Sequence, residues 1–171
     1  MFKTWFCKLA ICVIAAFLVS SHEGKAQRFA VSTDLLQWGL VSPNVGFEAA
    51  ISQHHGFSFS ASASPFRISD GFSFRHLTVA PEYKYWFNMP FYGHYAGASV
   101  LYSSYDIHAG KIARTGNLIA ACATYGYSLI IGRRWNLVPH AGIGVGIDAG
   151  AKTAFVPLVA KLGVNIQLMV K

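Results

Sequence analysis

The feature that most constrains this chain is a two-residue alternation of side-chain character, which is clearest in the twelve residues HLTVAPEYKYWF at 76–87. Successive side chains of an extended strand point to opposite faces. Every odd-numbered position in this stretch is apolar or aromatic, whereas the even-numbered positions include His76, Glu82 and Lys84. One apolar face and one polar face predict a strand that packs against either a protein core or lipid.

Composition favours lipid over a protein core. The chain of 171 residues is 53% hydrophobic, 15% aromatic and only 12% charged, whereas about a quarter of the residues of a soluble domain are charged. Beyond the N-terminus there is no run of about 18 uninterrupted apolar residues, so a membrane-spanning helix is not expected. The other structure that can expose apolar side chains to lipid is a closed sheet, because it pairs every backbone group and leaves no strand edge in lipid.

Eight extended segments follow one another along the chain, at 29–36, 44–51, 56–65, 75–87, 93–107, 117–132, 136–149 and 156–170. Short connections at 53–55, 88–92 and 133–135 alternate with longer ones at 37–43, 66–74, 108–116 and 150–155. The even count and this rhythm predict an all-β fold, an eight-stranded antiparallel up-and-down transmembrane β-barrel. Proline removes a ladder donor, so we expect bulges or local register breaks at Pro81, Pro139 and Pro157.

Residues 1–27 have the pattern of a secretory signal peptide. Two lysines precede an apolar run at 9–19, and the small residues Gly24 and Ala26 stand before the expected cleavage point. Export would leave the barrel domain 28–171 in the outer membrane of a Gram-negative bacterium. Two of the three cysteines would be lost with the signal, so the third can form neither a disulfide nor a cysteine metal site within its own chain.

The basic residues indicate which partners to expect. The formal net charge of +7 is compatible with nucleic-acid binding. The basic residues, however, stand singly or as the pair Arg133 and Arg134, with no basic stripe and no nucleic-acid motif. We therefore exclude nucleic acid and expect outer-membrane lipid as a partner, together with cell-surface or periplasmic proteins.

The polar faces of the predicted strands are expected to line the lumen. In 56–65 and 136–149 these faces carry mainly serine or glycine, which suit the crowded interior of a small barrel. The charged and titratable residues on the lumen faces are Asp34, Glu48, Glu82, Lys84, His140, Asp148 and Lys161. Isolated buried charges are costly, so we expect a paired network that fills the lumen. The same residues would also suit a narrow polar conduit or a small-ligand site.

Aromatic residues gather near both sets of connections, where they predict two interfacial girdles. The outer girdle would contain Trp38, Phe72, Phe74, Tyr105 and Phe155. The inner girdle would contain Trp86, Phe87, Phe91, Tyr92 and Trp135. Aromatic residues also fill the cores of soluble β-proteins, so their position at strand ends favours the girdles without requiring them.

One combination of residues could support catalysis. Asp106 and His108 share a strand face, and Ser103 and Ser104 lie nearby, so a carboxylate could orient a histidine that activates a serine. The spacing is generic and serine is abundant throughout the chain. We therefore predict a protein that is not an enzyme, and we keep as an alternative a barrel enzyme that acts on lipid or peptide.

Neither a metal nor a cofactor is expected. His54 and His55 are adjacent, so on a strand their side chains would point to opposite faces, and no third ligand is evident. A soluble lipocalin-like barrel that binds a small ligand is a further alternative. Its faces would be reversed, with apolar side chains inside and polar side chains outside.

Several spaced motifs occur in a familiar order: STDLL at 32–36, SPNVGFE at 42–48, HLTVAPEYKYWF at 76–87, GHYAG at 93–97, YGYSLIIGRRWNL at 125–137 and AGIGVG at 141–146. This order resembles a Gram-negative outer-membrane β-barrel family of unknown function. Its members are often encoded near fimbrial or adhesin genes. The resemblance implies a structural or interaction role, for example in the assembly or anchoring of surface appendages, and it supplies no catalytic residues.

Overall fold

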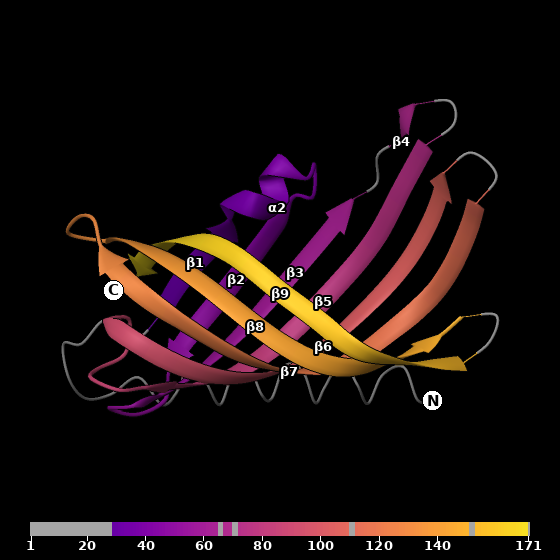
Figure 1. Ribbon diagram of the computed structural model, residues 1–171. Helices are drawn as coiled ribbons and strands as arrows, with labels where there is room; N and C mark the ends of the chain where they lie inside the picture. Colours follow the sequence, from indigo (N-terminus) through magenta and orange to yellow (C-terminus); the bar gives the residue numbers. More distant parts are fainter. Residues whose placement is uncertain (1–28, 65–66, 70–71, 110–111, 151–152, 171) are drawn as a thin grey trace, which may run out of the picture.

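The computed structural model describes residues 29–64, 67–69, 72–109, 112–150 and 153–170 (Figure 1). The elements in chain order are β1 (Phe29–Asp34), α2 (Leu35–Gly39), β2 (Asn44–Ala50), β3 (His55–Ser64), β4 (Arg67–Ser69), β5 (Phe72–Trp86), β6 (Gly93–Ala109), β7 (Ile112–Ile130), β8 (Trp135–Ala149) and β9 (Thr153–Val170). The expected signal peptide at 1–27 lies outside the described residues. Within the described ranges, no helix is long and apolar enough to cross a membrane.

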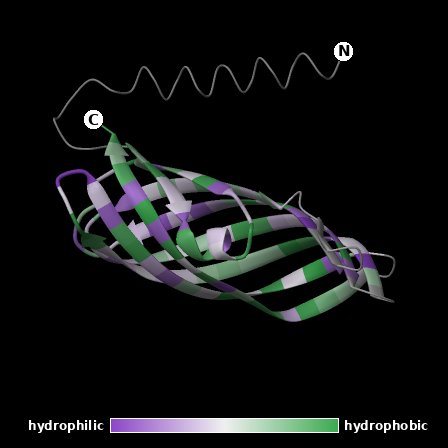
Figure 2. Cartoon of the chain, turned by 90° about the horizontal axis from the view of Figure 1, so that it is seen from above, coloured by the Kyte–Doolittle hydropathy of each residue, from purple (hydrophilic) through white to green (hydrophobic). Residues whose placement is uncertain are grey.

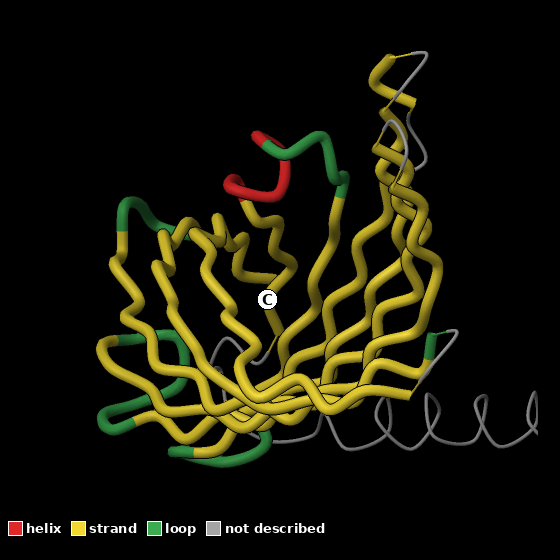
Figure 3. The backbone as a smooth tube through the Cα atoms, turned by 45° about the vertical axis from the view of Figure 1, so that its right-hand side comes forward, coloured by secondary structure: helices red, strands yellow, loops and turns green. Residues whose placement is uncertain are grey.

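The strands form one closed antiparallel ring. Neighbouring strands pair in the order β3-β2-β1-β9-β8-β7-β6-β5-β4, and β3 also pairs with β5. Phe29 pairs with Val170, which joins the first strand to the last, and β4 pairs with β5 beyond the end of β3. Strands β3 and β4 therefore share one place in a ring of eight (Figures 1 and 3). The predicted eight-stranded antiparallel up-and-down barrel is confirmed.

The first predicted strand is shorter than expected, because Leu35 and Leu36 begin a helix instead of extending it. The Asp34 side chain accepts hydrogen bonds from the backbone N–H groups of Leu36, at 2.8 Å, and Gln37, at 3.3 Å. A carboxylate that satisfies the free N–H groups of a first turn is a favourable N-cap. Helix α2 consequently follows β1 directly at one end of the barrel (Figure 1).

The two ends of the barrel differ. The short-turn end carries the connections 51–54, 87–92 and 131–134, and the long-loop end carries α2 and the remaining connections. Two of the predicted long loops, 66–74 and 108–116, are instead mostly strand: the β6–β7 ladder, for example, continues to the pair Ala109 and Ile112. The ends of β5, β6 and β7 therefore project beyond the rest of the ring (Figure 3).

Alternation separates a polar interior from an apolar exterior. Ser62, Ser99 and Thr124 are buried inside, whereas Ile143 and Leu162 are 66% and 68% exposed on the outside. Figure 2 shows hydrophobic and hydrophilic residues alternating along the strands. This is the reverse of the arrangement expected for a soluble lipocalin-like barrel. The lipocalin-like alternative, which requires apolar side chains inside and polar side chains outside, is therefore wrong.

The three strand prolines behave in two ways. The β8–β9 register shifts by one residue between Gly144 and Gly146, opposite Pro157, so the expected bulge is present there. At Pro81 the β5–β6 pairing stops after Val79 and resumes without a shift. The β7–β8 pairing is interrupted in the same way opposite Pro139. A missing N–H thus breaks the ladder locally and does not always displace the register.

Aromatic side chains fill the interior at the short-turn end. Trp86 and Tyr95 are fully buried, with ring centroids 4.9 Å apart, and Phe91 lies 6.1 Å from Trp86. A side chain at Gly126 would collide with the Tyr95 ring, so the glycine provides the space that this ring occupies. The placement of Trp86 and Phe91 in an exterior girdle is therefore wrong, because both rings pack inside the barrel.

Candidate functional site

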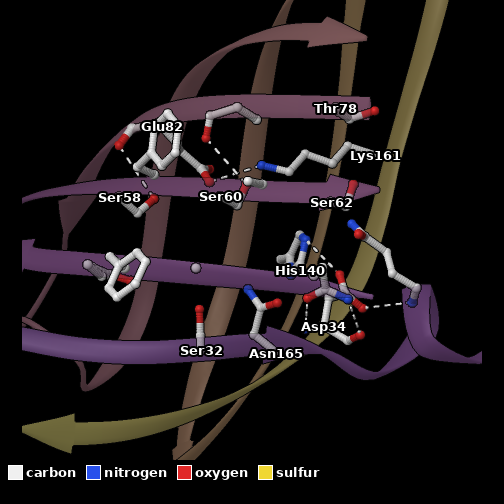
Figure 4. Close-up of a pocket in the computed structure, with 18 of the residues that line it drawn as sticks. Ser32, Asp34, Ser58, Ser60, Ser62, Thr78, Glu82, His140, Lys161 and Asn165 are labelled. Atoms are coloured by element: carbon white, nitrogen blue, oxygen red, sulfur yellow. Dashed lines mark hydrogen bonds and ion pairs between the residues drawn. The ribbon is translucent and has the colours of Figure 1, made fainter. Parts of the chain in front are cut away.

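A polar cavity of about 90 Å³ lies inside the barrel and is the candidate site (Figure 4). Serines of β1 and β3 form one wall, including Ser32, Ser58 and Ser60. Ser60 Oγ donates to the Ala80 carbonyl at 3.3 Å, so part of this wall is bonded to the neighbouring strand. A bound water needs about 10–15 Å³ of such volume, so the cavity has room for a few waters or a very small polar molecule.

A buried ion pair lies at the edge of this cavity toward the short-turn end. Lys84 Nζ donates to Glu48 Oε2 at 2.7 Å, and the two side chains are only 3% and 2% exposed. Gln167 Nε2 donates to the same carboxylate oxygen at 2.9 Å, and Lys84 Nζ lies 4.7 Å from the centre of the Tyr95 ring. The pair thus has additional polar and aromatic partners, which offset part of the cost of burying both charges.

A second ion pair crosses the barrel. Lys161 Nζ on β9 donates to Glu82 Oε2 on β5 at 3.0 Å, and Figure 4 shows the lysine extending toward the carboxylate. Strands β5 and β9 are four places apart in the ring of eight, so they face each other across the lumen. A Cβ at Gly97 would lie 2.6 Å from Glu82 Oε1. Glycine at position 97 therefore gives this carboxylate its space.

A third contact joins Asp34 to His140. Asp34 Oδ2 lies 3.9 Å from His140 Nε2, and both side chains are almost completely buried. Asp34 also caps α2 and accepts from the Val164 N–H at 3.4 Å. A side chain at Gly163 would collide with both the aspartate and the histidine. Asp34 therefore connects the helix at the mouth of the barrel to two strands of its wall.

The cavity is lined by six of the seven lumen residues named from the sequence: Asp34, Glu48, Glu82, Lys84, His140 and Lys161. The seventh, Asp148, accepts a hydrogen bond from the Tyr105 hydroxyl elsewhere in the interior. Glu82 and Lys84 do not bond to each other, because residues two apart on a strand point in parallel and each finds its partner on another strand. Gln167 was not identified from the sequence, although its inward position on the alternating last strand could have indicated it.

The predicted girdle residues divide into three groups. Exposed on the exterior are Trp38, Phe87, Tyr92, Trp135 and Phe155. Inside the barrel lie Trp86 and Phe91, described above, and Tyr105, which bonds to Asp148, so its assignment to the outer girdle is wrong as well. Phe72 and Phe74 lie on β5, with side chains outside the described part of the molecule. A membrane-interface role for the exposed group stays a prediction.

The possible catalytic residues are not assembled. Asp106 Oδ1 and His108 Nδ1 lie 3.5 Å apart on the exterior, but Ser103 Oγ points inward and bonds to Thr78 Oγ1 at 2.7 Å. Among the described residues, no hydrogen bond joins Ser104 to His108. Because the serine that would act as nucleophile must contact the histidine, this arrangement does not form a triad.

The two adjacent histidines also have separate partners. His54 Nδ1 lies 2.9 Å from the Trp86 carbonyl oxygen, and His55 Nδ1 contacts the Tyr83 hydroxyl. In the described part of the chain, no group of three or more His, Cys, Asp or Glu side chains is placed to hold a metal ion. Cys122 is a buried free thiol on the inward face of β7.

Comparison with known proteins agrees with this architecture. No curated protein sequence matches the chain. The crystal structure of Neisserial surface protein A (NspA) is similar, with a TM-score of 0.56 over 86% of this chain and 100% of that one, at 12% sequence identity. At this identity the likeness concerns the fold alone. A family model described as a protein of unknown function (DUF3575) matches residues 10–155. Because the match covers most of the sequence, the chain belongs to the DUF3575 family.

Proposed function

We propose that this protein spans the outer membrane as a small barrel with a structural or interaction role and a lumen closed by its charged network. The observation that carries the proposal is the inverted polarity of the barrel. Large apolar side chains such as Phe47, Ile143 and Leu162 are exposed outside, and Glu48, Glu82 and Lys84 are buried inside. Apolar side chains exposed in this way are unfavourable in water and favourable in lipid. The closed ring encloses the charged side chains and separates them from that lipid.

The strand lengths support a membrane-spanning position. A tilted strand crosses a bilayer with about 9–11 residues. Strands β6, β7 and β9 contain 17, 19 and 18 residues, so each can cross and still extend beyond the apolar layer. Their additional length would lie at the long-loop end, where β5, β6 and β7 project (Figure 3).

The ion pairs support a closed lumen. The Lys161 to Glu82 contact joins opposite walls, and the Lys84 to Glu48 contact lies beside it. Toward the short-turn end the interior is filled by aromatic and apolar side chains, among them Trp86. A ring of eight strands leaves an interior only wide enough for side chains. A solute would have to displace both the ion pairs and the aromatic side chains.

The first experiment measures conductance and membrane insertion together. Purified protein without residues 1–27 is reconstituted in planar bilayers, and its mobility on a gel is compared before and after heating. We expect a heat-dependent mobility shift and no steady conductance. The variant Asp106→Ala removes a charge from the exterior and none from the lumen, so it should insert and conduct like the wild type. A soluble protein without a mobility shift, or a steady open conductance, would refute the proposal.

The interaction role is supported by the projecting ends of β5, β6 and β7, which provide a surface beyond the proposed membrane layer. Arg75 on β5 pairs in register with Asp106 on β6, and Thr115 Oγ1 on β7 donates to Asp106 Oδ1 at 2.9 Å. Deletion of the gene should alter the number or anchoring of surface appendages. Unchanged appendages, combined with hydrolysis of a lipid or peptide by the purified protein, would favour the enzyme alternative instead.

A further inference from the structure

Histidine and tyrosine rings form a cluster on the exterior of the barrel at the short-turn end. We call this cluster the imidazole–phenol belt, and its members are His54, His55, His94, Tyr83, Tyr85 and Tyr125. Tyr85 contacts both adjacent histidines, with ring centroids 5.9 Å from His54 and 5.4 Å from His55. Phe87 lies between Tyr85 and Tyr125, at 5.9 Å and 6.4 Å. The belt therefore runs continuously from the start of β3 across β5 and β6 to β7.

Each histidine of the belt is held by the same ring nitrogen. His54 Nδ1 contacts the Trp86 carbonyl oxygen at 2.9 Å, and His94 Nδ1 contacts the Tyr125 hydroxyl at 2.8 Å. His55 Nδ1 contacts the Tyr83 hydroxyl. Among the described residues, no hydrogen bond joins Nε2 of any of these three rings to the protein. When an imidazole is protonated, that nitrogen is a donor and the ring is cationic.

The sequence segments around the belt contain no acidic residues. The three segments that form the short-turn end, 50–57, 85–95 and 128–137, contain no aspartate and no glutamate. The turn between β7 and β8 adds Arg133 and Arg134, both of which are exposed. Further along the same strands the exterior becomes apolar. The belt therefore lies at the boundary between the apolar exterior and a rim of exclusively basic charge.

We propose that the imidazole–phenol belt binds the phosphate groups of phospholipids in the leaflet that surrounds the short-turn end. This inference rests on the proposed membrane-spanning position. Because His54 Nδ1 faces a carbonyl oxygen, it carries a proton, and Nε2 of that ring is a second donor when the imidazole is protonated. A phosphate accepts hydrogen bonds from such an imidazolium and from phenol groups, and the tyrosine rings place their apolar bodies against the acyl chains beside it. The three rings are each held through Nδ1, so when protonated they present their Nε2 donors to the headgroup region in fixed positions.

The experiment compares lipid binding by variants of the folded protein. Wild type and the triple variant His54→Gln, His55→Gln and His94→Gln are titrated with phosphatidylglycerol and with phosphatidylcholine, and bound lipids are counted by native mass spectrometry. The triple variant should bind phosphatidylglycerol at least about fivefold more weakly, the change expected from losing one cation near an anionic surface. The control is His108→Gln, an exposed histidine on the same strand as His94 but at the long-loop end, and it should bind like the wild type.

A second comparison separates headgroup binding from simple packing. Wild-type affinity for phosphatidylglycerol should rise as the pH is lowered from about 8 to about 5.5, because a protonated imidazole is a cation and donates from both ring nitrogens. The titratable groups in ring or hydrogen-bond contact with the three imidazoles are phenols, of Tyr83, Tyr85, Tyr125 and Tyr127. The variant His94→Lys, which keeps a cation at all these pH values, should retain binding and weaken the pH dependence.

Two results would overturn the inference. One is a triple variant that inserts into vesicles, shifts on heating like the wild type and binds phosphatidylglycerol equally well. The other is an equal loss of binding in His108→Gln, which would show that the effect does not belong to the belt. If the wild-type protein does not insert into membranes at all, the proposed function fails first, and the gel assay reports that separately.

Discussion

Lys161 on β9 reaches across the barrel to Glu82 on β5, and its Nζ atom lies 3.0 Å from Glu82 Oε2. The two strands stand opposite each other in the ring, so this single contact connects walls that share no ladder hydrogen bonds. The two side chains of a buried ion pair depend on each other, because removal of one leaves the charge of the other buried without a partner. Several tests of the structure follow from this property and from the separation of the two faces.

The first prediction concerns this ion pair. Glu82→Ala should lower the free energy of unfolding by about 3–5 kcal/mol, because the Lys161 ammonium would remain in the interior without a carboxylate. The double variant Glu82→Leu with Lys161→Met should lose much less, since both charges are then removed. Urea unfolding in lipid vesicles measures both. Small and additive losses would instead place these charges in contact with water.

A glycine pair tests the space around Asp34 and His140. Gly163→Ala should destabilise the protein by about 1–3 kcal/mol, because the added methyl group would collide with both side chains. Gly39→Ala is the matched control, since a methyl group at Gly39 would have no neighbour within 4 Å. The same urea titration applies to both. Equal effects of the two substitutions would contradict the close contact at position 163.

Trp86 tests the packing at the short-turn end. Its ring is fully buried against Tyr95 and Phe91, so Trp86→Ala should cost about 3–5 kcal/mol of stability. Trp135 is exposed on the exterior, and Trp135→Ala should cost much less in detergent. Brominated lipids should quench the fluorescence of Trp135 and leave that of Trp86 largely unchanged. Strong quenching of Trp86 would place it outside the barrel.

A thiol test examines the two faces of β7. Cys122 points inward and is 5% exposed, so a water-soluble maleimide should leave it unmodified in the folded protein and label it after unfolding. Ala123 is the next residue and lies on the exposed face. The variant Cys122→Ala with Ala123→Cys should therefore be labelled by a lipid-soluble maleimide in the folded state. Equal labelling at both positions would argue against alternation on this strand.

Period-two alternation, together with the low content of charged residues and the alternating lengths of the connections, predicts the barrel. The same rule placed Glu82, Lys84 and Lys161 inside. It could not pair them, since the partner of an inward side chain depends on the position of strands distant in sequence. Gln167 was missed for a related reason: its bond to Glu48 joins β9 to β2, two strands that are far apart in the sequence.

The errors have local causes. Aromatic residues were assigned to girdles by their nearness to strand ends, but Trp86 and Tyr105 follow the inward alternation of their own strands and pack inside. Helix α2 was missed because a five-residue helix has no periodicity, and its one sequence signal is the capping residue Asp34. The loops are shorter than predicted. The β6–β7 ladder, for example, continues to Ala109 and Ile112, through residues whose apolar and polar side chains do not alternate clearly.

The pairing of Phe29 with Val170 has a consequence for the order in which the barrel can be completed. The residues that join β1 to β9 come from the two ends of the described chain, so this contact has nearly the greatest sequence separation available. Contacts of this kind form late and slow the search for the native state. Until they form, both strands present unpaired edges that attract other chains. Both edges disappear only when Phe29 and Val170 pair, so closure of the ring is the step that ends the exposure of unpaired strands to other chains.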